Sequence, residues 1–79
     1  MTPAQHATTA AAEVAFTSPI YVEVELAALR AQGHAILAGK TGTGSNYTSA
    51  EAALVNATVS TANRRAEAHR AIAYALLAT

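Results

Sequence analysis

Apolar and polar positions along the chain predict three helical segments separated by two breaks, at 17–19 and 39–46. The first segment runs from Pro3 to about Phe16 and is rich in alanine, which favours a helix. Thr2 followed by Pro3 is typical of a helix start. Because Thr8 and Thr9 weaken the helix, we expect this segment to be loose or to depend on a partner.

The second segment begins after Ser18 and Pro19, which are suited to a helix cap and a first helical residue. Residues 20–26 alternate between apolar and polar side chains, which is the period of a strand. The composition beyond Leu26 favours a helix, and a lone strand would have no evident pairing partner. We therefore predict a helix from about Pro19 to Ala38, with a short strand at 20–26 as the alternative. Gly33 lies inside it and indicates a bend or a close helix contact.

The third segment follows a glycine-rich loop and has no glycine or proline before its end. Thr48 and Glu51 fit a capping box, so we predict one helix of about 29 residues that ends near Leu77. Apolar positions along it alternate in steps of three and four, which is typical of a coiled-coil-like seam. The predicted seam begins at Ala52, and its interface residues are Val55, Val59, Ala62, Ala66, His69, Ala73 and Leu76.

Composition limits how much core the chain can form. Of its 79 residues, 22 are alanine, and no cysteine is present to form a disulfide or a thiolate metal site. Alanine contributes little apolar area, and a chain of this size buries only about 60% of the surface that its unfolded form exposes. We therefore predict one all-α domain over 1–79. It is a helical hairpin or three-helix unit with a long C-terminal helix, assembled into a helical homo-oligomer.

The charges sum to zero, from five basic and five acidic side chains. Because phosphate neutralisation supplies much of the affinity for nucleic acids, we expect no nucleic-acid partner. The charges are unevenly placed: residues 1–29 carry three glutamates and no basic side chain, and residues 30–79 carry the opposite excess. The two halves could attract each other within a chain or between copies, although solvated helix faces are the simpler interpretation.

Neither a membrane span nor a secretion signal is visible in the sequence. The first basic residue is Arg30, and Glu13 interrupts the early apolar stretch, so a secretory signal is not expected. No run approaches the roughly 20 apolar residues that span a bilayer. We expect a cytoplasmic protein, or a component of a virion or other assembly, with no membrane partner.

The glycine-rich loop is the first candidate for chemistry. The segment from Gly33 to Lys40-Thr41 resembles a phosphate-binding loop, but five residues separate Gly33 from Gly39 where that loop has four. The chain also contains no aspartate to bind magnesium. Free N–H groups at the start of the last helix could still hold an anion together with nearby hydroxyls and one cation. The candidate ligand-binding residues are Lys40, Thr41, Thr43, Ser45 and Ser49.

Three histidines, at positions 6, 34 and 69, are the side chains that titrate near neutrality. They are far apart in sequence and lack the spacing of metal ligands, so we predict neither a metal site nor a cofactor. No nucleophile adjoins a base, so we predict no catalytic residue. His69 falls on the predicted seam, where it could set the register or weaken the assembly in acid, or simply touch solvent at the seam edge.

These observations favour a non-enzymatic interaction or structural subunit that associates with itself or docks on a protein partner. The alternative is a binder of a small anion or nucleotide that uses loop 39–49 at a helix N-terminus.

Overall fold

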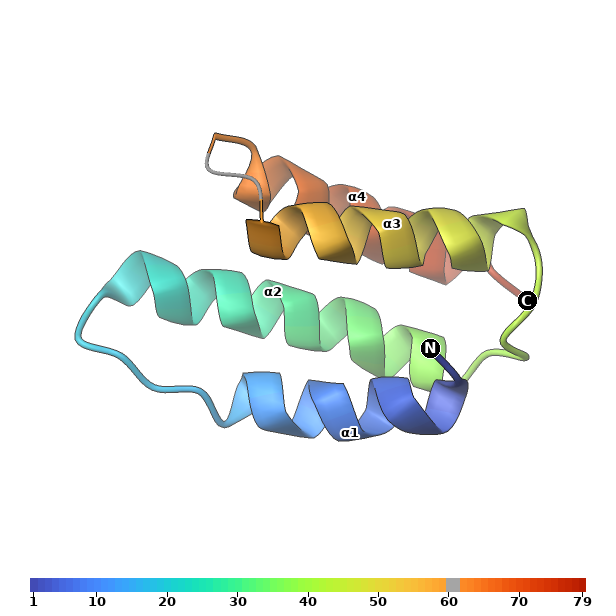
Figure 1. The fold of residues 1–79 in the computed structure, drawn as a ribbon, viewed down its shortest axis with the longest axis horizontal. Helices are drawn as coiled ribbons and strands as arrows, with labels where there is room; N and C mark the ends of the chain where they lie inside the picture. Colours follow the sequence, from blue (N-terminus) through green and yellow to red (C-terminus); the bar gives the residue numbers. More distant parts are fainter. Residues whose placement is uncertain (60–61) are drawn as a thin grey trace.

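The computed structural model describes residues 1–59 and 62–79, and this part of the chain is helical, with no strand. Its four helices are α1 (Pro3–Val14), α2 (Tyr21–Ala38), α3 (Ser45–Val59) and α4 (Arg64–Leu77) (Figure 1). The predicted all-α class is confirmed, and so are the first two helices to within two residues at each end. The alternative of a strand at 20–26 is wrong.

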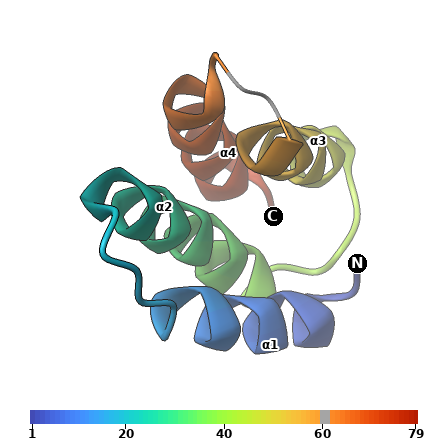
Figure 2. The same ribbon diagram turned by 60° about the vertical axis from the view of Figure 1, so that its left-hand side comes forward.

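The helices form two antiparallel pairs that α2 joins. Helix α1 packs on α2, and α3 packs on α4. Helix α2 also packs on α4 and, less extensively, on α3 (Figures 1 and 2). The backbones of α1 and α3 do not pack against each other within the described residues. The bundle therefore has three closed sides and one open side, between α1 and α3.

The predicted single long helix is wrong, because the chain turns between α3 and α4. Helix α3 ends at Val59 and α4 begins at Arg64, so two helices stand where one was expected; Ser60 and Thr61 lie outside the described residues. The sequence around the turn, Thr58-Val59-Ser60-Thr61, combines β-branched and hydroxyl side chains, which have low helix propensity. A periodicity carried mainly by alanine continues through such a turn without marking it.

The helix starts differ in how well the sequence predicted them. Thr2 caps α1 as expected: its hydroxyl accepts from Gln5 N–H, and the Gln5 side chain accepts from Thr2 N–H. The predicted capping box of Thr48 and Glu51 is wrong, because α3 begins earlier, at Ser45. The Thr48 hydroxyl donates to the carbonyl of Gly44 instead, and Glu51 is free to reach α1.

The core is built mainly of alanine and lies between α2, α3 and α4. Three leucines and Tyr47 are its large apolar side chains in the described part of the chain. The rest of the buried apolar set is nine alanines, at positions 27, 31, 50, 53, 57, 68, 71, 75 and 78. Small side chains let the helices approach closely, but they bury little apolar area.

The predicted interface residues all lie on the surface. Val55 and Val59 are exposed on α3, Ala62 is exposed in the connection, and the remaining four are exposed on α4. Because α3 and α4 run antiparallel, these residues do not form one seam along a single helix. Their exposure leaves them accessible to a second molecule.

The acidic first part of the chain pairs with the basic remainder inside the molecule. Glu13 binds Arg30, Glu23 binds Arg64, and Glu25 lies near Arg65, with closest N–O distances of 2.9, 2.9 and 3.4 Å. The uneven charge distribution is therefore satisfied between helices, and the simpler interpretation of purely solvated faces does not hold for these side chains.

Among the described residues, the search for a membrane-spanning helix finds no helix with the necessary length and apolar character.

Gly33 marks a close contact between α2 and the α3–α4 pair. The sequence indicated either a bend or a close helix contact at this position. A Cβ atom at this position would lie 3.1 Å from Leu54 Cδ2 and 3.9 Å from the Cβ of Ala71. Both neighbours are buried, so there is no room for a branched side chain.

We predict that Gly33→Val lowers the free energy of unfolding by about 1–3 kcal/mol, because the added methyl groups displace Leu54 in a packed core. Ala35→Val is the matched control, since it places the same side chain at an exposed position of the same helix. Urea unfolding followed by circular dichroism measures both. Equal stability of the two variants would contradict the close contact.

Candidate functional site

The inner face of α1 is polar. His6 is the one buried residue of this helix, and Thr9 and Glu13 on the same face are half-buried. No large apolar side chain of α1 enters the core. Since α1 nevertheless packs on α2, its position depends on polar contacts more than on hydrophobic burial.

Two histidine rings meet at the centre of this contact. His6 is 1% exposed and His34 of α2 is 7% exposed. Their Nδ1 atoms lie 2.7 Å apart, a hydrogen-bond distance, and their ring centroids are 5.0 Å apart. Such a bond needs a proton on one Nδ1 and a lone pair on the other, so it cannot form when both rings are fully protonated.

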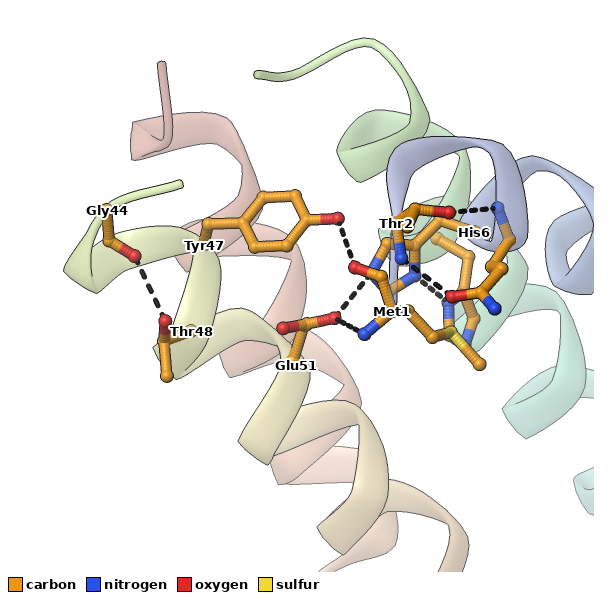
Figure 3. A network of polar contacts seen from close by, with 9 residues as sticks. Met1, Thr2, His6, Gly44, Tyr47, Thr48 and Glu51 are labelled. Carbon is orange, nitrogen blue, oxygen red and sulfur yellow. Dashed lines mark hydrogen bonds and ion pairs between the residues drawn. The ribbon is translucent and has the colours of Figure 1, made fainter. Parts of the chain in front are cut away.

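Helix α3 supplies the other partners of His6. Glu51 Oε2 lies 2.9 Å from His6 Nε2 and 2.9 Å from the N-terminal ammonium of Met1 (Figure 3). The Tyr47 hydroxyl donates to the Met1 carbonyl at 2.9 Å, and its ring packs edge-on against His6. These five residues, Met1, His6, His34, Tyr47 and Glu51, are the histidine cluster, and they connect α1 to α3 at the open side of the bundle.

The bonds determine where the protons lie. Glu51 accepts, so His6 donates to it from Nε2–H. The Glu51 carboxylate already has one cation, the ammonium of Met1. When His6 is neutral, the bond to Glu51 places its proton on Nε2, and its Nδ1 carries a lone pair. It follows that His34 donates from Nδ1–H and that Nε2 of His34 is unprotonated.

Burial and neighbouring groups together shift the pKa of each ionisable partner of His6 below its ordinary value. Burial, reinforced by the neighbouring His6, holds the pKa of His34 below its ordinary value of 6.5; Arg30 adds to this effect, while Glu13 and Glu51 oppose it. Burial disfavours ionisation of Glu51, but hydrogen bonds from the N-terminal ammonium and His6 outweigh it and hold the Glu51 pKa below 4.5. A neutral His34 and an ionised Glu51 at neutral pH agree with the proton positions above.

A second polar contact joins α1 to α2 farther along the helices. The guanidinium of Arg30 donates to both carboxylate oxygens of Glu13, with N–O distances of 2.9 and 3.3 Å. It also donates to the Ala57 carbonyl of α3 at 3.4 Å. Both side chains are largely buried, and a two-bond pair of this kind fixes orientation as well as distance.

The open side of the bundle is a groove of about 500 Å³. Helix α1 forms one wall and α3 the other, and His34 of α2 together with Leu54 contributes to the lining. Most of the surface facing the groove is apolar, with threonine hydroxyls and the carboxylates of Glu13 and Glu51 at its edges. The histidine cluster therefore borders a space large enough for a small molecule.

Of the predicted anion-binding residues, the structure brings Thr41 and Thr43 together and places Ser49 at another surface. The Thr41 backbone N–H and its hydroxyl both contact the carbonyl of Thr79, at 2.9 and 3.0 Å, and the Thr41 and Thr43 hydroxyls lie 3.1 Å apart. Ser45 is the exposed first residue of α3, and Lys40 is half-buried. Ser49 instead borders a shallow depression with Tyr74 of α4. The loop hydroxyls are thus engaged in bonds within the chain.

Of the three histidines, the fold brings two together. His69 is exposed on α4, apart from the other pair. Glu51 and Tyr47, which complete the cluster, were not singled out for this role from the sequence, where Glu51 fitted a helix cap. The i, i+4 spacing of Tyr47 and Glu51 on one helix face was the available signal. No group of three ligands able to hold a metal ion occurs among the described residues.

Acid is expected to destabilise the protein through His34. Because folding lowers the pKa of this ring, the folded state binds fewer protons than the unfolded state, so stability is full above pH 6.5 and falls below it. Urea unfolding from about pH 8 to about pH 5 should show a loss of up to about 1.4 kcal/mol for each pH unit below the ordinary histidine value. His34→Gln should remove most of this slope and the exposed-site control His69→Gln should keep it. A flat profile in the unmodified protein would refute the assignment.

Comparison of the chain with protein-family models, with curated proteins and with solved structures finds no match.

Proposed function

We propose that the protein is a non-enzymatic interaction module that associates with a second copy of itself through its exposed apolar side chains. The observation that carries the proposal is the distribution of large apolar residues. Leu26, Leu37 and Leu54 are the aliphatic side chains larger than alanine that are buried in the described structure. Eight other valine, isoleucine, leucine and phenylalanine side chains are exposed, at positions 14, 16, 20, 22, 55, 59, 76 and 77.

A stable monomer normally buries most of its large apolar side chains, and this chain exposes many of them. Burying a large apolar side chain contributes about 1.5–3 kcal/mol, and here eight of the fifteen valine, isoleucine, leucine and phenylalanine side chains are exposed. Small domains with thin cores commonly gain the difference by association. Exposed apolar side chains that adjoin one another typically mark an interaction surface.

A second copy is a suitable partner on electrostatic grounds. The formal net charge is zero, and four of the five glutamates, at positions 13, 23, 25 and 67, are paired with arginines inside the chain. Two copies therefore meet without net repulsion. A two-fold interface would place the same apolar face on both molecules, as in most homodimers. The proposed surface is the exposed side of α3 and α4, and Val59 and Leu76 lie at opposite ends of this antiparallel pair.

The anion-binding alternative has less support. A bound phosphate needs free donors, and the Thr41 amide and hydroxyl already contact the carbonyl of Thr79. The available Lys40 is a single cation beside them. An anion would have to displace these contacts, so we do not adopt this function.

Size-exclusion chromatography with light scattering tests the proposal. The unmodified protein should have at least twice the monomer mass, and Val59→Lys combined with Leu76→Lys should weaken association tenfold or more, because each lysine would place a charge in an apolar interface. Ala12→Lys combined with Ala35→Lys adds the same charge at exposed positions of α1 and α2, outside the proposed surface, and should leave the mass unchanged. A strict monomer at high protein concentration would rule out self-association.

A further inference from the structure

The strongest unexplained feature is a hydrogen-bond acceptor beside an apolar groove. His34 lines the groove between α1 and α3, and its Nδ1 is occupied by His6. No bond to its other ring nitrogen, Nε2, is present among the described residues. The one fully buried side-chain polar atom without a partner in that part of the chain is Glu67 Oε2, so His34 Nε2 is reachable from outside. The opening available to it is the groove.

The histidine cluster fixes the chemistry of that nitrogen. With both rings neutral, the bond to Glu51 places the His6 proton on Nε2, so His6 Nδ1 accepts and His34 donates from Nδ1–H. His34 Nε2 is left with a lone pair and no proton. It can accept a hydrogen bond from a ligand, and it cannot donate one.

The walls of the groove select against charge. The lining contains no lysine or arginine, and Glu51 already engages the Met1 ammonium, so an anion finds no free cation there. The carboxylates of Glu13 and Glu51 each already have a cation, Arg30 for the first and the N-terminal ammonium for the second, so neither calls for a cationic ligand. Leu54, Val55 and Ala52 supply an apolar surface beside these groups. The volume of about 500 Å³ lies within the range of small-molecule sites.

We propose that the groove between α1 and α3 binds a neutral small molecule that has an apolar body and a hydroxyl group, such as an alcohol or phenol, with the hydroxyl donating to His34 Nε2. The apolar body lies against Leu54 and Val55, and the hydroxyl replaces the water that an empty groove would offer to the nitrogen. The groove shares Val55 with the exposed apolar side chains, but Val59 and Leu76, which the self-association test changes, do not line it.

A matched pair of probes tests the proposal by isothermal titration at neutral pH: 1-naphthol, which has the hydroxyl, and 1-methoxynaphthalene, which lacks the proton. The ether is the more apolar of the two probes, so non-specific binding to an apolar surface would favour the ether. We expect saturable 1:1 binding with naphthol bound about fivefold or more tightly than the ether, the usual contribution of one neutral hydrogen bond. Absence of saturable binding, or equal binding of both probes, would overturn the proposal.

Two variants locate the site. His34→Phe keeps a ring but removes Nε2, and it should reduce naphthol binding to the level of the ether. Ala52→Trp fills the groove and should abolish binding of both probes, while Ala12→Trp, at an exposed position of α1 outside the groove lining, should leave binding unchanged. Loss of binding in Ala12→Trp, or full retention in Ala52→Trp, would place the ligand elsewhere and overturn the proposal.

Nitrogen-15 spectra of the histidine rings provide a readout in the unmodified protein, which is needed because His34→Phe deprives His6 of a donor. His34 Nε2 should have the chemical shift of an unprotonated ring nitrogen and should move toward the protonated value when naphthol is added. A proton on Nε2 in the free protein would contradict the arrangement on which the site depends.

Discussion

The hydrogen bond between the buried rings of His6 and His34 determines where α1 lies, and much of the remaining structure follows from it. Helix α1 buries no large apolar side chain, so its attachment depends on this bond, on the Glu51 carboxylate and on the Glu13–Arg30 pair. Buried polar contacts of this kind are specific in geometry and contribute modestly in net free energy. Helix α1 is thus held in one defined position by contacts that depend on protonation. The same contacts border the groove and determine which nitrogen of His34 carries the proton.

The alanine-rich core explains the rest of the surface. Alanines at the α3–α4 and α2–α4 contacts let helices approach closely, and Gly33 extends this against Leu54. The consequence is that seven of the fourteen valine, isoleucine and leucine side chains remain exposed. A chain that places small residues inside and large ones outside has the composition of a subunit, whose larger side chains become buried when another surface covers them.

The sequence predicted the helical class and the first two helices because alanine content, Thr2-Pro3 and Gly39 are local signals. It failed at 58–63 because an alanine periodicity passes through a turn unchanged, and because hydroxyl and β-branched residues are only weak terminators. The histidine cluster could not be predicted, since His6, His34 and Glu51 come from three helices whose packing is not encoded locally. Glu51 also fitted a competing local role in a capping box, which the earlier start of α3 removes. The charge imbalance between the two parts of the chain did contain non-local information, which the pairs of Glu13 and Glu23 with arginines now explain.

Native-state hydrogen exchange of the α1 amides, compared between the unmodified protein and His6→Ala, tests the central claim most directly. Alanine is the better helix former, so any loss of protection reports on docking and not on helix propensity. Removing the His6 bonds should raise exchange of the α1 amides by about tenfold to a hundredfold, while amides in α3 and α4 keep their protection. Unchanged protection of α1, or an equal loss in all four helices, would show that the histidine pair does not hold this helix in place.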